Sequence, residues 1–248
     1  MNKQRIDLLL QARGLAESRT KAQALIMAGV VLVDEKRVEK PSESFAEDAT
    51  IRIKGDSPEN RYVSRGGVKL EGALRSFSID PAGFICLDVG SSTGGFTDCL
   101  LRHGASRVIC VDSGTNQLDW RLRNDERVEV RENTNARGLK QSDFQTLFDL
   151  IVVDVSFISV TKIIPALVGL LKPDGMFIIL IKPQFEVGRG EVGKGGIIHE
   201  PEKHERVVRE INGFADSLGL NCSGLIESPI LGAEGNKEFL ALYKLSDL

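Results

Sequence analysis

Apolar residues from about residue 64 onward follow two alternating patterns, short continuous runs and runs with helical spacing. Continuous runs of about four to eight residues between turn formers indicate buried strands, and apolar positions three and four apart indicate amphipathic helices. The predicted strands are Ile85–Val89, Arg107–Asp112, Val128–Arg131, Leu150–Asp154, Met176–Ile181, Cys222–Glu227 and Phe239–Leu245. The predicted helices are Lys69–Ser76, Phe96–His103, Gln117–Asn124, Ser159–Leu171 and Glu202–Leu218.

This alternation predicts the fold class of the larger part of the chain. Residues 150–153 and 177–181 are apolar throughout, as is typical of parallel strands that are covered on both faces. Only the segment Pro229–Gly235 separates the last two strands, so we expect them to pair in antiparallel fashion. The prediction is an α/β fold, a doubly wound sheet with an antiparallel last strand.

The first 55 residues predict a separate, small α+β domain. One short helix is expected to end at Gly14, and a second is expected to begin after the capping residue Ser18 and to end at Gly29. Residues 30–33 and 50–53 are predicted to form short strands. Turn formers without periodicity then indicate a linker. The expected domains are residues 1–55 and 64–248, with the linker at 56–63.

Composition places the chain among ordinary folded proteins. Its 248 residues are 42% hydrophobic and 27% charged with a net charge of −3, which argues against disorder and against a uniformly basic surface. The four cysteines have no paired spacing and do not group with the three histidines, so we expect reduced thiols rather than disulfides or a zinc site. No apolar run approaches the roughly 20 residues of a membrane span. We therefore expect a cytoplasmic protein.

A glycine-rich segment, Asp88–Phe96, follows the first predicted strand of the second domain and opens a helix. Glycines let the backbone approach a ligand closely, and a helix N-terminus offers free N–H groups. The spacing differs from the G-x-G-x-x-G of nicotinamide sites. Asp112 ends the next strand, where a carboxylate can accept both hydroxyls of a ribose. These features favour an adenosine-containing cofactor over a glycine turn that serves packing alone.

Three acidic residues, Asp88, Asp112 and Asp154, are expected at the carboxyl edge of the sheet. Such a group of carboxylates also suits a magnesium ion, which prefers oxygen ligands. Because the cofactor segment accounts for two of the three, we predict no metal site.

The residues at these positions resemble those of the class I S-adenosylmethionine methyltransferases, through Asp88–Phe96 together with Asp112. Four charged residues resemble the catalytic Lys-Asp-Lys-Glu tetrad of FtsJ-type ribose 2′-O-methyltransferases, namely Lys69, Asp154, Lys182 and Glu238. The resemblance implies a Rossmann-like methyltransferase sheet and S-adenosylmethionine as the cofactor. The cofactor-binding residues that it implies are Asp88, Gly90, Ser91, Ser92, Thr93, Gly94, Gly95, Asp112, Asn135 and Phe157. An acidic partner for adenine is not evident after the third strand.

The N-terminal segments resemble the S-four RNA-binding domain, named for a small-subunit ribosomal protein, at Arg5–Asp7, Gly14–Ala16, Ser18–Arg19 and Ala28–Val33. That domain joined to this type of methyltransferase is the arrangement of the TlyA family, often labelled hemolysin A. Segments 64–69, 154–159 and 182–188 extend the resemblance over almost the whole chain. It implies methyl transfer to a cytidine 2′-hydroxyl of ribosomal RNA. Because the chain ends just after the last strand, as in the shorter members, we expect a target in large-subunit RNA.

The residue chemistry also separates this reaction from other methylations. Thiol-dependent methylation of a pyrimidine carbon needs a cysteine in the loops after the fourth or fifth strand, and none stands there. The amino-methyltransferase pattern carries prolines after the fourth strand, whereas the chain has Asp154–Phe157. A ribose hydroxyl must lose its proton as it attacks. We assign proton acceptance to Lys182, its orientation to Asp154 and Lys69, and positioning of the lysines to Glu238. Whether Lys182 acts as a neutral base or as a fixed cation stays open.

Basic residues are concentrated in two segments of this acidic chain. Residues 1–40 hold eight basic and five acidic residues, and residues 61–76 hold four basic and one acidic residue. A basic face of this kind suits RNA phosphates, and ribosomal RNA or a ribosomal subunit is the expected partner. The predicted RNA-binding residues are Arg5, Arg19, Lys21, Arg61, Arg65 and Arg189. Arg189 belongs to the glycine-rich segment Gln184–His199, which we expect to form a mobile loop on the substrate side.

Two other classes of function remain open at this stage. The hemolysin label suggests a membrane-damaging protein, which would need a membrane span or a long amphipathic helix, and neither is visible. A non-catalytic RNA-binding factor of ribosome assembly would not require the tetrad or the cofactor segment.

Overall fold

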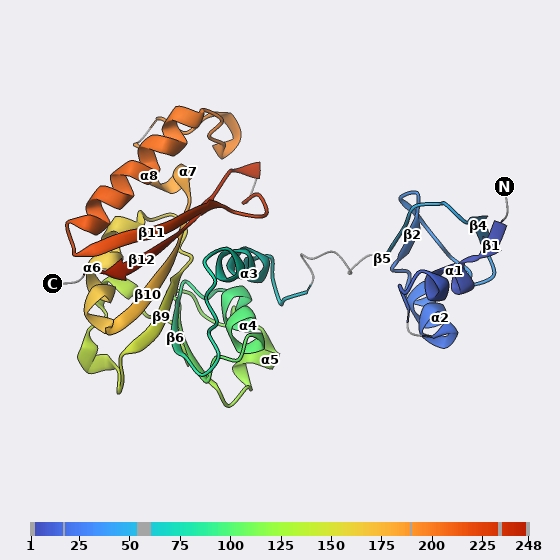
Figure 1. Cartoon of the computed structure of the whole chain (residues 1–248), viewed down its shortest axis with the longest axis horizontal. Coiled ribbons are helices and arrows are strands. Elements are labelled where there is room, and N and C mark those ends of the chain that lie inside the picture. Colours follow the sequence, from blue (N-terminus) through green and yellow to red (C-terminus); the bar gives the residue numbers. More distant parts are fainter. Residues whose placement is uncertain (1–2, 17, 54–60, 189, 233–234, 247–248) are drawn as a thin grey trace. The chain divides into compact units, whose positions relative to one another are not determined.

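The computed structural model describes residues 3–16, 18–53, 61–188, 190–232 and 235–246. The chain forms two compact units, residues 1–61 and residues 62–248, and each is described by itself (Figure 1).

The first unit is built from two short helices and five short strands. These elements are β1 (Lys3–Arg5), α1 (Ile6–Ala12), α2 (Arg19–Met27), β2 (Val31–Val33), β3 (Lys36–Arg37), β4 (Ser44–Ala46) and β5 (Ile51–Ile53). Strand β1 pairs with β4, and β2 pairs with β3 and β5, all antiparallel. Ser18 caps α2 by accepting a hydrogen bond from the backbone of Lys21, as expected of a serine there. Ile6, Leu10 and Ile26 are buried together with residues of β2 in one apolar core.

The second unit contains one seven-stranded sheet in the order β11-β12-β10-β9-β6-β7-β8. Its strands are β6 (Ile85–Val89), β7 (Arg107–Val111), β8 (Val128–Arg131), β9 (Phe148–Val153), β10 (Leu171–Ile181), β11 (Leu220–Glu227) and β12 (Phe239–Leu245). Its α-helices are α3 (Gly66–Ser76), α4 (Gly95–Arg102), α5 (Trp120–Arg123), α6 (Ile164–Leu167), α7 (Pro183–Glu186) and α8 (Pro201–Asp216). Short 3₁₀ helices lie at Ala136–Gly138, Gln141–Asp143, Val160–Lys162, Val168–Leu170 and Lys194–Gly196.

The sheet is covered on both faces, which confirms the predicted fold class. Strands β8, β7, β6, β9 and β10 are parallel, and β12 is antiparallel to both β10 and β11. Alternate residues of a strand point to opposite faces. On β6, Leu87 packs in the core that contains residues of α6 and α8, and Cys86 packs in the core that contains residues of α3, α4 and α5.

The predicted helix over Ser159–Leu171 is wrong. The segment instead forms a 3₁₀ turn, the short helix α6 and a second 3₁₀ turn. Pro165 has no backbone N–H and fits only in the first turn of a helix, so a new helix begins next to it. Strand β10 begins at Leu171 rather than Met176, because Leu171 already pairs with Phe148 before a register shift.

The predicted helix Gln117–Asn124 is also shorter than expected. Helix α5 begins at Trp120, because the side chain of Asp119 caps it by accepting a hydrogen bond from the backbone of Arg121. The four cysteines are free thiols, and burial raises the pKa of the Cys86 and Cys110 thiols well above the ordinary value. Across the described ranges, every helix is too short or too polar to span a bilayer.

Candidate active site

The sheet topology brings the ends of distant segments to one edge. Strands β9 and β10 are parallel, so Asp154 and Lys182, which follow them, lie at the same edge. Strand β12 runs the opposite way, with Phe239 paired to Ile181, so Glu238 lies at this edge too. Lys69 comes from α3, the helix that precedes the first strand of the sheet.

Two ion pairs join these four side chains. Lys69 Nζ lies 2.5 Å from Glu238 Oε2, and Lys182 Nζ lies 2.6 Å from Asp154 Oδ1. Lys182 also donates a hydrogen bond of 2.8 Å to Ser156 Oγ. Lys69 thus contacts Glu238, to which we assigned the positioning of the lysines, and Lys182 contacts Asp154, to which we assigned part of its orientation. The four side chains are between 2% and 22% exposed, so solvent screens their charges only weakly.

Lys69 reaches this edge because α3 and α4 approach each other closely. A Cβ atom at Gly95 would overlap Ser64 Oγ and would lie 2.9 Å from the backbone nitrogen of Gly67. A Cβ atom at Gly66 would contact the Phe96 ring at 3.4 Å. Gly95, which we predicted to bind the cofactor, is therefore also required for the packing that places α3.

The carboxylate of Glu238 is enclosed by the chain that precedes β12. A Cβ atom at Gly232 would overlap Glu238 Oε1, so any other residue at position 232 would displace that carboxylate. Ser228 donates a backbone hydrogen bond of 2.8 Å to the carbonyl of Glu238, which holds the base of the β11–β12 connection together. Glu238 is 2% exposed and reaches Lys69 from inside the protein.

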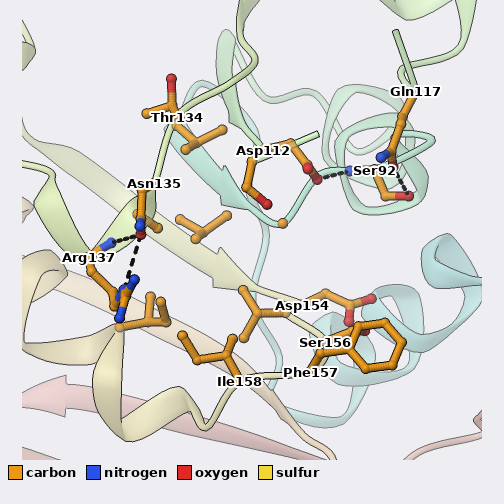
Figure 2. Close-up of a pocket in the computed structure, with 17 residues that line it drawn as sticks. Ser92, Asp112, Gln117, Thr134, Asn135, Arg137, Asp154, Ser156, Phe157 and Ile158 are labelled. Carbon is orange, nitrogen blue, oxygen red and sulfur yellow. Dashed lines mark hydrogen bonds between the residues drawn. The ribbon is translucent and has the colours of Figure 1, made fainter. Parts of the chain in front are cut away.

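A cavity of about 510 Å³ lies at the carboxyl ends of β6, β7 and β9, a size typical of small-molecule sites (Figure 2). Figure 2 shows Asp112 beside Ser92, Asn135 beside Arg137, and Asp154, Ser156 and Phe157 along another wall. Five of the predicted cofactor residues line the cavity, namely Gly90, Ser92, Asp112, Asn135 and Phe157.

Gly90 and Asp112 shape this cavity through the backbone. Gly90 has φ +83°, and a Cβ atom there would overlap the carbonyl oxygen of Asp154, so only glycine fits where the ends of β6 and β9 meet. The Asp112 carboxylate accepts hydrogen bonds from the backbone nitrogens of Ser92 at 2.8 Å and Gly114 at 2.7 Å. The bond from Ser92 holds the segment Asp88–Phe96 to the end of β7.

A smaller cavity of about 230 Å³ adjoins the first and contains both lysines. The two cavities share Gly90, Ser92, Asp154 and Ser156 as lining residues. The predicted cofactor residues that line the smaller one are Gly90, Ser92, Asp88, Ser91, Thr93 and Gly95. Gly94 is a lining residue of neither cavity. It has φ +94°, and a Cβ atom there would overlap Leu122, so its glycine serves the turn and its packing.

Asp88 is a buried acid at the wall of the smaller cavity. Its Oδ2 accepts a hydrogen bond of 2.6 Å from Thr97, and its Oδ1 has no hydrogen-bond partner among the described residues. Burial, opposed by the Thr97 hydrogen bond and reinforced by the nearby charges of Asp154 and Asp112, raises the pKa of the Asp88 carboxyl to about 7. A buried acceptor without a partner at a cavity wall is a place for a donor group of a ligand.

Phe157 and Asn135 both line the larger cavity. Phe157 has φ +63° and is 90% exposed, and its ring centroid lies 5.0 Å from that of Phe185. Asn135 caps a 3₁₀ turn by accepting a hydrogen bond of 3.1 Å from the backbone of Arg137. After the third strand of the sheet, the cavity is lined by Thr134–Arg137, which include no acidic residue that could bind adenine.

Two of the basic residues predicted to bind RNA in the first unit, Arg5 and Arg19, contact a buried acid. Arg5 forms a two-pronged pair with Asp7, at 3.0 and 2.9 Å, and Arg19 lies 3.0 Å from the same carboxylate. Gln23 donates a further hydrogen bond of 3.1 Å to it. Asp7 is fully buried while the two arginine side chains are 41% and 50% exposed. Asp7 thus fixes two arginines at the surface of the unit.

This cluster predicts a pH dependence of the first unit. Hydrogen bonds from Arg5 hold the pKa of the Asp7 carboxyl well below its ordinary value near 3.8. A lowered pKa means that the stabilisation is present above about pH 4 and is lost as the pH falls further. In an NMR titration of the full chain, we expect the α1 and α2 amide signals to lose dispersion below about pH 4. Asp7→Asn should lose it already at neutral pH, whereas the exposed control Asp48→Asn should not. Unchanged signals in Asp7→Asn would contradict this account.

The other predicted RNA-binding residues are placed in different ways. Lys21 on α2 and Arg61 are exposed. Arg65 is exposed as well, and its Nη2 donates a hydrogen bond of 3.0 Å to the carbonyl of Leu231. It therefore joins α3 to the chain that precedes Glu238. Arg189 lies outside the described residues.

Several residues of the site could not be found by their type alone. Ser156 contacts Lys182 directly, and Gln117 accepts a hydrogen bond of 3.1 Å from Ser92 at the cavity wall. A polar residue two positions after the end of a parallel strand was the available signal for Ser156. Gly232 gave no signal, because its role depends on the fold around Glu238.

Comparisons with known proteins find two families in the chain. The model of the FtsJ-like methyltransferase family matches residues 62–245, and that of the S4 domain, the S-four type of RNA-binding domain, matches residues 4–51. A 16S/23S rRNA (cytidine-2′-O)-methyltransferase, TlyA of Mycobacterium tuberculosis, is 46% identical over 95% of this chain and 87% of its own. A 23S rRNA (cytidine-2′-O)-methyltransferase, TlyA of Campylobacter jejuni, is 32% identical over 96% of this chain and 98% of its own.

A solved structure that carries the name hemolysin, from Streptococcus thermophilus, is similar as well. It is 44% identical, covers 100% of this chain and 90% of its own, and superposes with a TM-score of 0.75. Hemolysin and methyltransferase names therefore occur among similar proteins of one family.

Proposed function

Because this chain belongs to the FtsJ-like methyltransferase family, and within it to the TlyA group, we propose that it transfers a methyl group from S-adenosylmethionine to a cytidine 2′-hydroxyl of ribosomal RNA. The observation that carries the proposal is the pair of ion pairs, Lys69–Glu238 and Lys182–Asp154, beside a cavity of cofactor size. We propose large-subunit RNA as the target, since both TlyA relatives are named as methyltransferases of 23S rRNA.

The cavity has the features that S-adenosylmethionine needs. The close approach at Gly90 leaves backbone at its wall, and the Asp112 carboxylate suits the ribose hydroxyls. In the adjoining smaller cavity, the unpartnered oxygen of Asp88 suits a donor group. When bound, this cofactor supplies a methyl group on a positively charged sulfur. We infer that Gly90, Ser92, Asp112, Asn135 and Asp88 hold it.

Asp112→Ala is expected to weaken the binding of S-adenosylmethionine roughly 10- to 100-fold, because hydrogen bonds to a charged group contribute about 1.5–3 kcal/mol. Isothermal titration calorimetry measures this change. Asp125→Ala is the matched control, since Asp125 pairs with Arg127 at 2.7 Å and lines neither cavity. Equal affinities of the Asp112→Ala and wild-type proteins would remove Asp112 from the cofactor site.

The ion pairs supply what the ribose oxygen requires. As the oxygen forms its bond to the methyl carbon, it loses a proton and gains negative charge. Lys182, held by Asp154 and Ser156, either accepts that proton or stabilises the charge as a cation. Lys69, whose positive charge is balanced by the Glu238 carboxylate, adds a second fixed ammonium group to the same small cavity. S-adenosylmethionine, when bound, would supply the methyl carbon, and its sulfur would keep the electron pair of the bond to that carbon.

The S4 domain accounts for RNA binding in this proposal. We assign the binding of RNA phosphates to Arg5, Arg19 and Lys21. Asp7 holds the two arginines at the surface of the domain. A ribosomal substrate would place the enzyme in the cytoplasm.

The experiment that tests this function is methyl transfer to isolated ribosomal subunits from cells that lack the protein. With tritiated S-adenosylmethionine, we expect label in the large subunit and none with the Lys182→Ala protein. Tight RNA binding without label in either subunit would favour the non-catalytic assembly factor. Leakage of liposomes by the purified protein without label would favour a membrane-active protein.

A further inference from the structure

The glycine-rich segment Gly193–Ile198 is fixed in place by side chains from outside it. The segment forms a small turn in which the backbone nitrogen of Gly193 donates a hydrogen bond of 3.1 Å to the carbonyl of Ile197. Gly195 and Gly196 have φ values of +78° and +80°. Glycines lose more conformational freedom on ordering than other residues, so such a segment needs anchors to keep one conformation.

Asn236, which lies shortly before β12, provides the first anchor. Its side chain accepts a hydrogen bond of 3.1 Å from the backbone nitrogen of Ile198 and donates one of 2.9 Å to the carbonyl of Gly196. Asn236 is 2% exposed, and its bond to Ile198 is buried, whereas its bond to Gly196 is partly buried. An amide side chain is suited to this role, because it offers one donor and one acceptor to the backbone of the segment.

His204 on α8 provides the second anchor. Its Nε2 lies 3.1 Å from the carbonyl oxygen of Ile198, which can only accept, so His204 donates from Nε2. Its ring centroid lies 5.8 Å from that of Phe239, the first residue of β12. Both backbone polar groups of Ile198 are therefore bonded, the N–H to Asn236 and the carbonyl oxygen to His204.

Asn236 also stands next to the Lys69–Glu238 pair. It is two residues before Glu238, and its carbonyl accepts a hydrogen bond of 2.8 Å from the backbone nitrogen of Gly232. A side chain at Gly232 would overlap the Glu238 carboxylate. The same short stretch of chain thus encloses Glu238 on one side and holds the segment Gly193–Ile198 on the other.

We propose that Asn236 is a positioning residue, which couples the conformation of the segment Gly193–Ile198 to the Glu238 carboxylate and so aligns the RNA with the catalytic lysines. This proposal rests on the proposed function. The segment follows Lys182 along the chain, and Asn236 joins it to the stretch that carries Glu238, so both ends of this connection lead to the catalytic pairs. Asn236 acts through its neighbours and does not itself contact the reacting atoms.

The test compares Asn236→Ala with wild type in the full chain, and Asn221→Ala, on the exposed side of β11, is the matched control. By hydrogen exchange, we expect the Ile198 amide to exchange roughly tenfold faster in Asn236→Ala only, because it loses a buried hydrogen bond. With large ribosomal subunits as substrate, we expect kcat to fall about tenfold or more, as misplacement does in active sites. The affinity for S-adenosylhomocysteine and the shape of the pH–rate profile should not change.

Unchanged exchange at Ile198 would overturn the proposal, and so would faster exchange with wild-type kcat and KM. If Asn236→Ala does not fold, Asn236→Ser, whose shorter side chain cannot bond both Ile198 and Gly196, is read by the same two measurements. Hydrogen exchange needs no RNA, so it separates the outcomes. Suppose that the wild-type protein transfers no methyl group while the Ile198 amide of Asn236→Ala still exchanges faster. The proposed function then fails, and the role of Asn236 in positioning the RNA is overturned with it. Only the anchoring of the segment by Asn236 remains.

Discussion

Lys182→Ala is expected to lower kcat by about 10²- to 10⁴-fold, the range that a positioned proton-transfer group contributes. Lys182 lines the smaller cavity and lies 2.6 Å from Asp154 and 2.8 Å from Ser156, which line both cavities. Its loss removes the group that accepts the ribose proton or stabilises the oxygen. The affinity for S-adenosylmethionine should change less than about threefold, because the groups assigned to the cofactor remain in place. Single-turnover methyl transfer together with calorimetry measures both quantities.

Lys172→Ala is the matched control for this substitution. Lys172 lies on the same strand, β10, and also pairs with an aspartate, with 2.7 Å between Nζ and Asp149 Oδ1, but its side chain is 39% exposed. It stands far along the strand from the site, so we expect wild-type turnover. Wild-type kcat in Lys182→Ala, with unchanged cofactor affinity, would show that another group handles the proton.

Glu238→Gln is expected to destabilise the second unit and to impair the reaction. Removing one member of a buried ion pair leaves an uncompensated charge, at a cost of about 3–5 kcal/mol in the free energy of unfolding. For a unit of this size we expect Tm to fall by roughly 6–15 °C. The ammonium of Lys69 would no longer be held at the sheet edge, so kcat should fall by about tenfold or more as well. Thermal unfolding and methyl transfer on the same sample measure the two effects.

Glu227→Gln, on the neighbouring strand β11, provides the comparison. Glu227 pairs with Lys237 at 3.2 Å, and both side chains are 51% exposed. An exposed pair contributes about 0–1 kcal/mol, so we expect a change of Tm below about 3 °C and unchanged turnover. Equal effects of the two substitutions would mean that the Lys69–Glu238 pair is an ordinary surface interaction.

Much of the fold could be predicted because buried parallel strands have a strong sequence signal. The run from Leu150 to Val153 is apolar throughout and forms the interior strand β9. The segment Ser159–Leu171 has helical apolar spacing, but Pro165 interrupts the hydrogen bonds that a continuous helix would need. Spacing reports which residues are buried, and a single proline decides whether they lie on one helix.

The site could be predicted in part, because the residues just after parallel strands all lie at one edge of the sheet. Asp154 was found in this way, and the resemblance added Lys69, Lys182 and Glu238. The pairing itself could not be predicted, because Lys69 reaches Glu238 only through the close approach at Gly95. Asn236 and Gly232 depend on contacts between segments that lie far apart in the sequence, for which spacing carries no signal.

The central claim is that these four charged side chains act on a sugar oxygen, and the identity of the methylated atom tests it most directly. Large-subunit RNA labelled by the purified protein can be hydrolysed with alkali, which cleaves only where a free 2′-hydroxyl is present. The account predicts that the label survives in an alkali-stable dinucleotide whose first nucleoside is 2′-O-methylcytidine. Label in a mononucleotide, with the methyl group on the base, would contradict it.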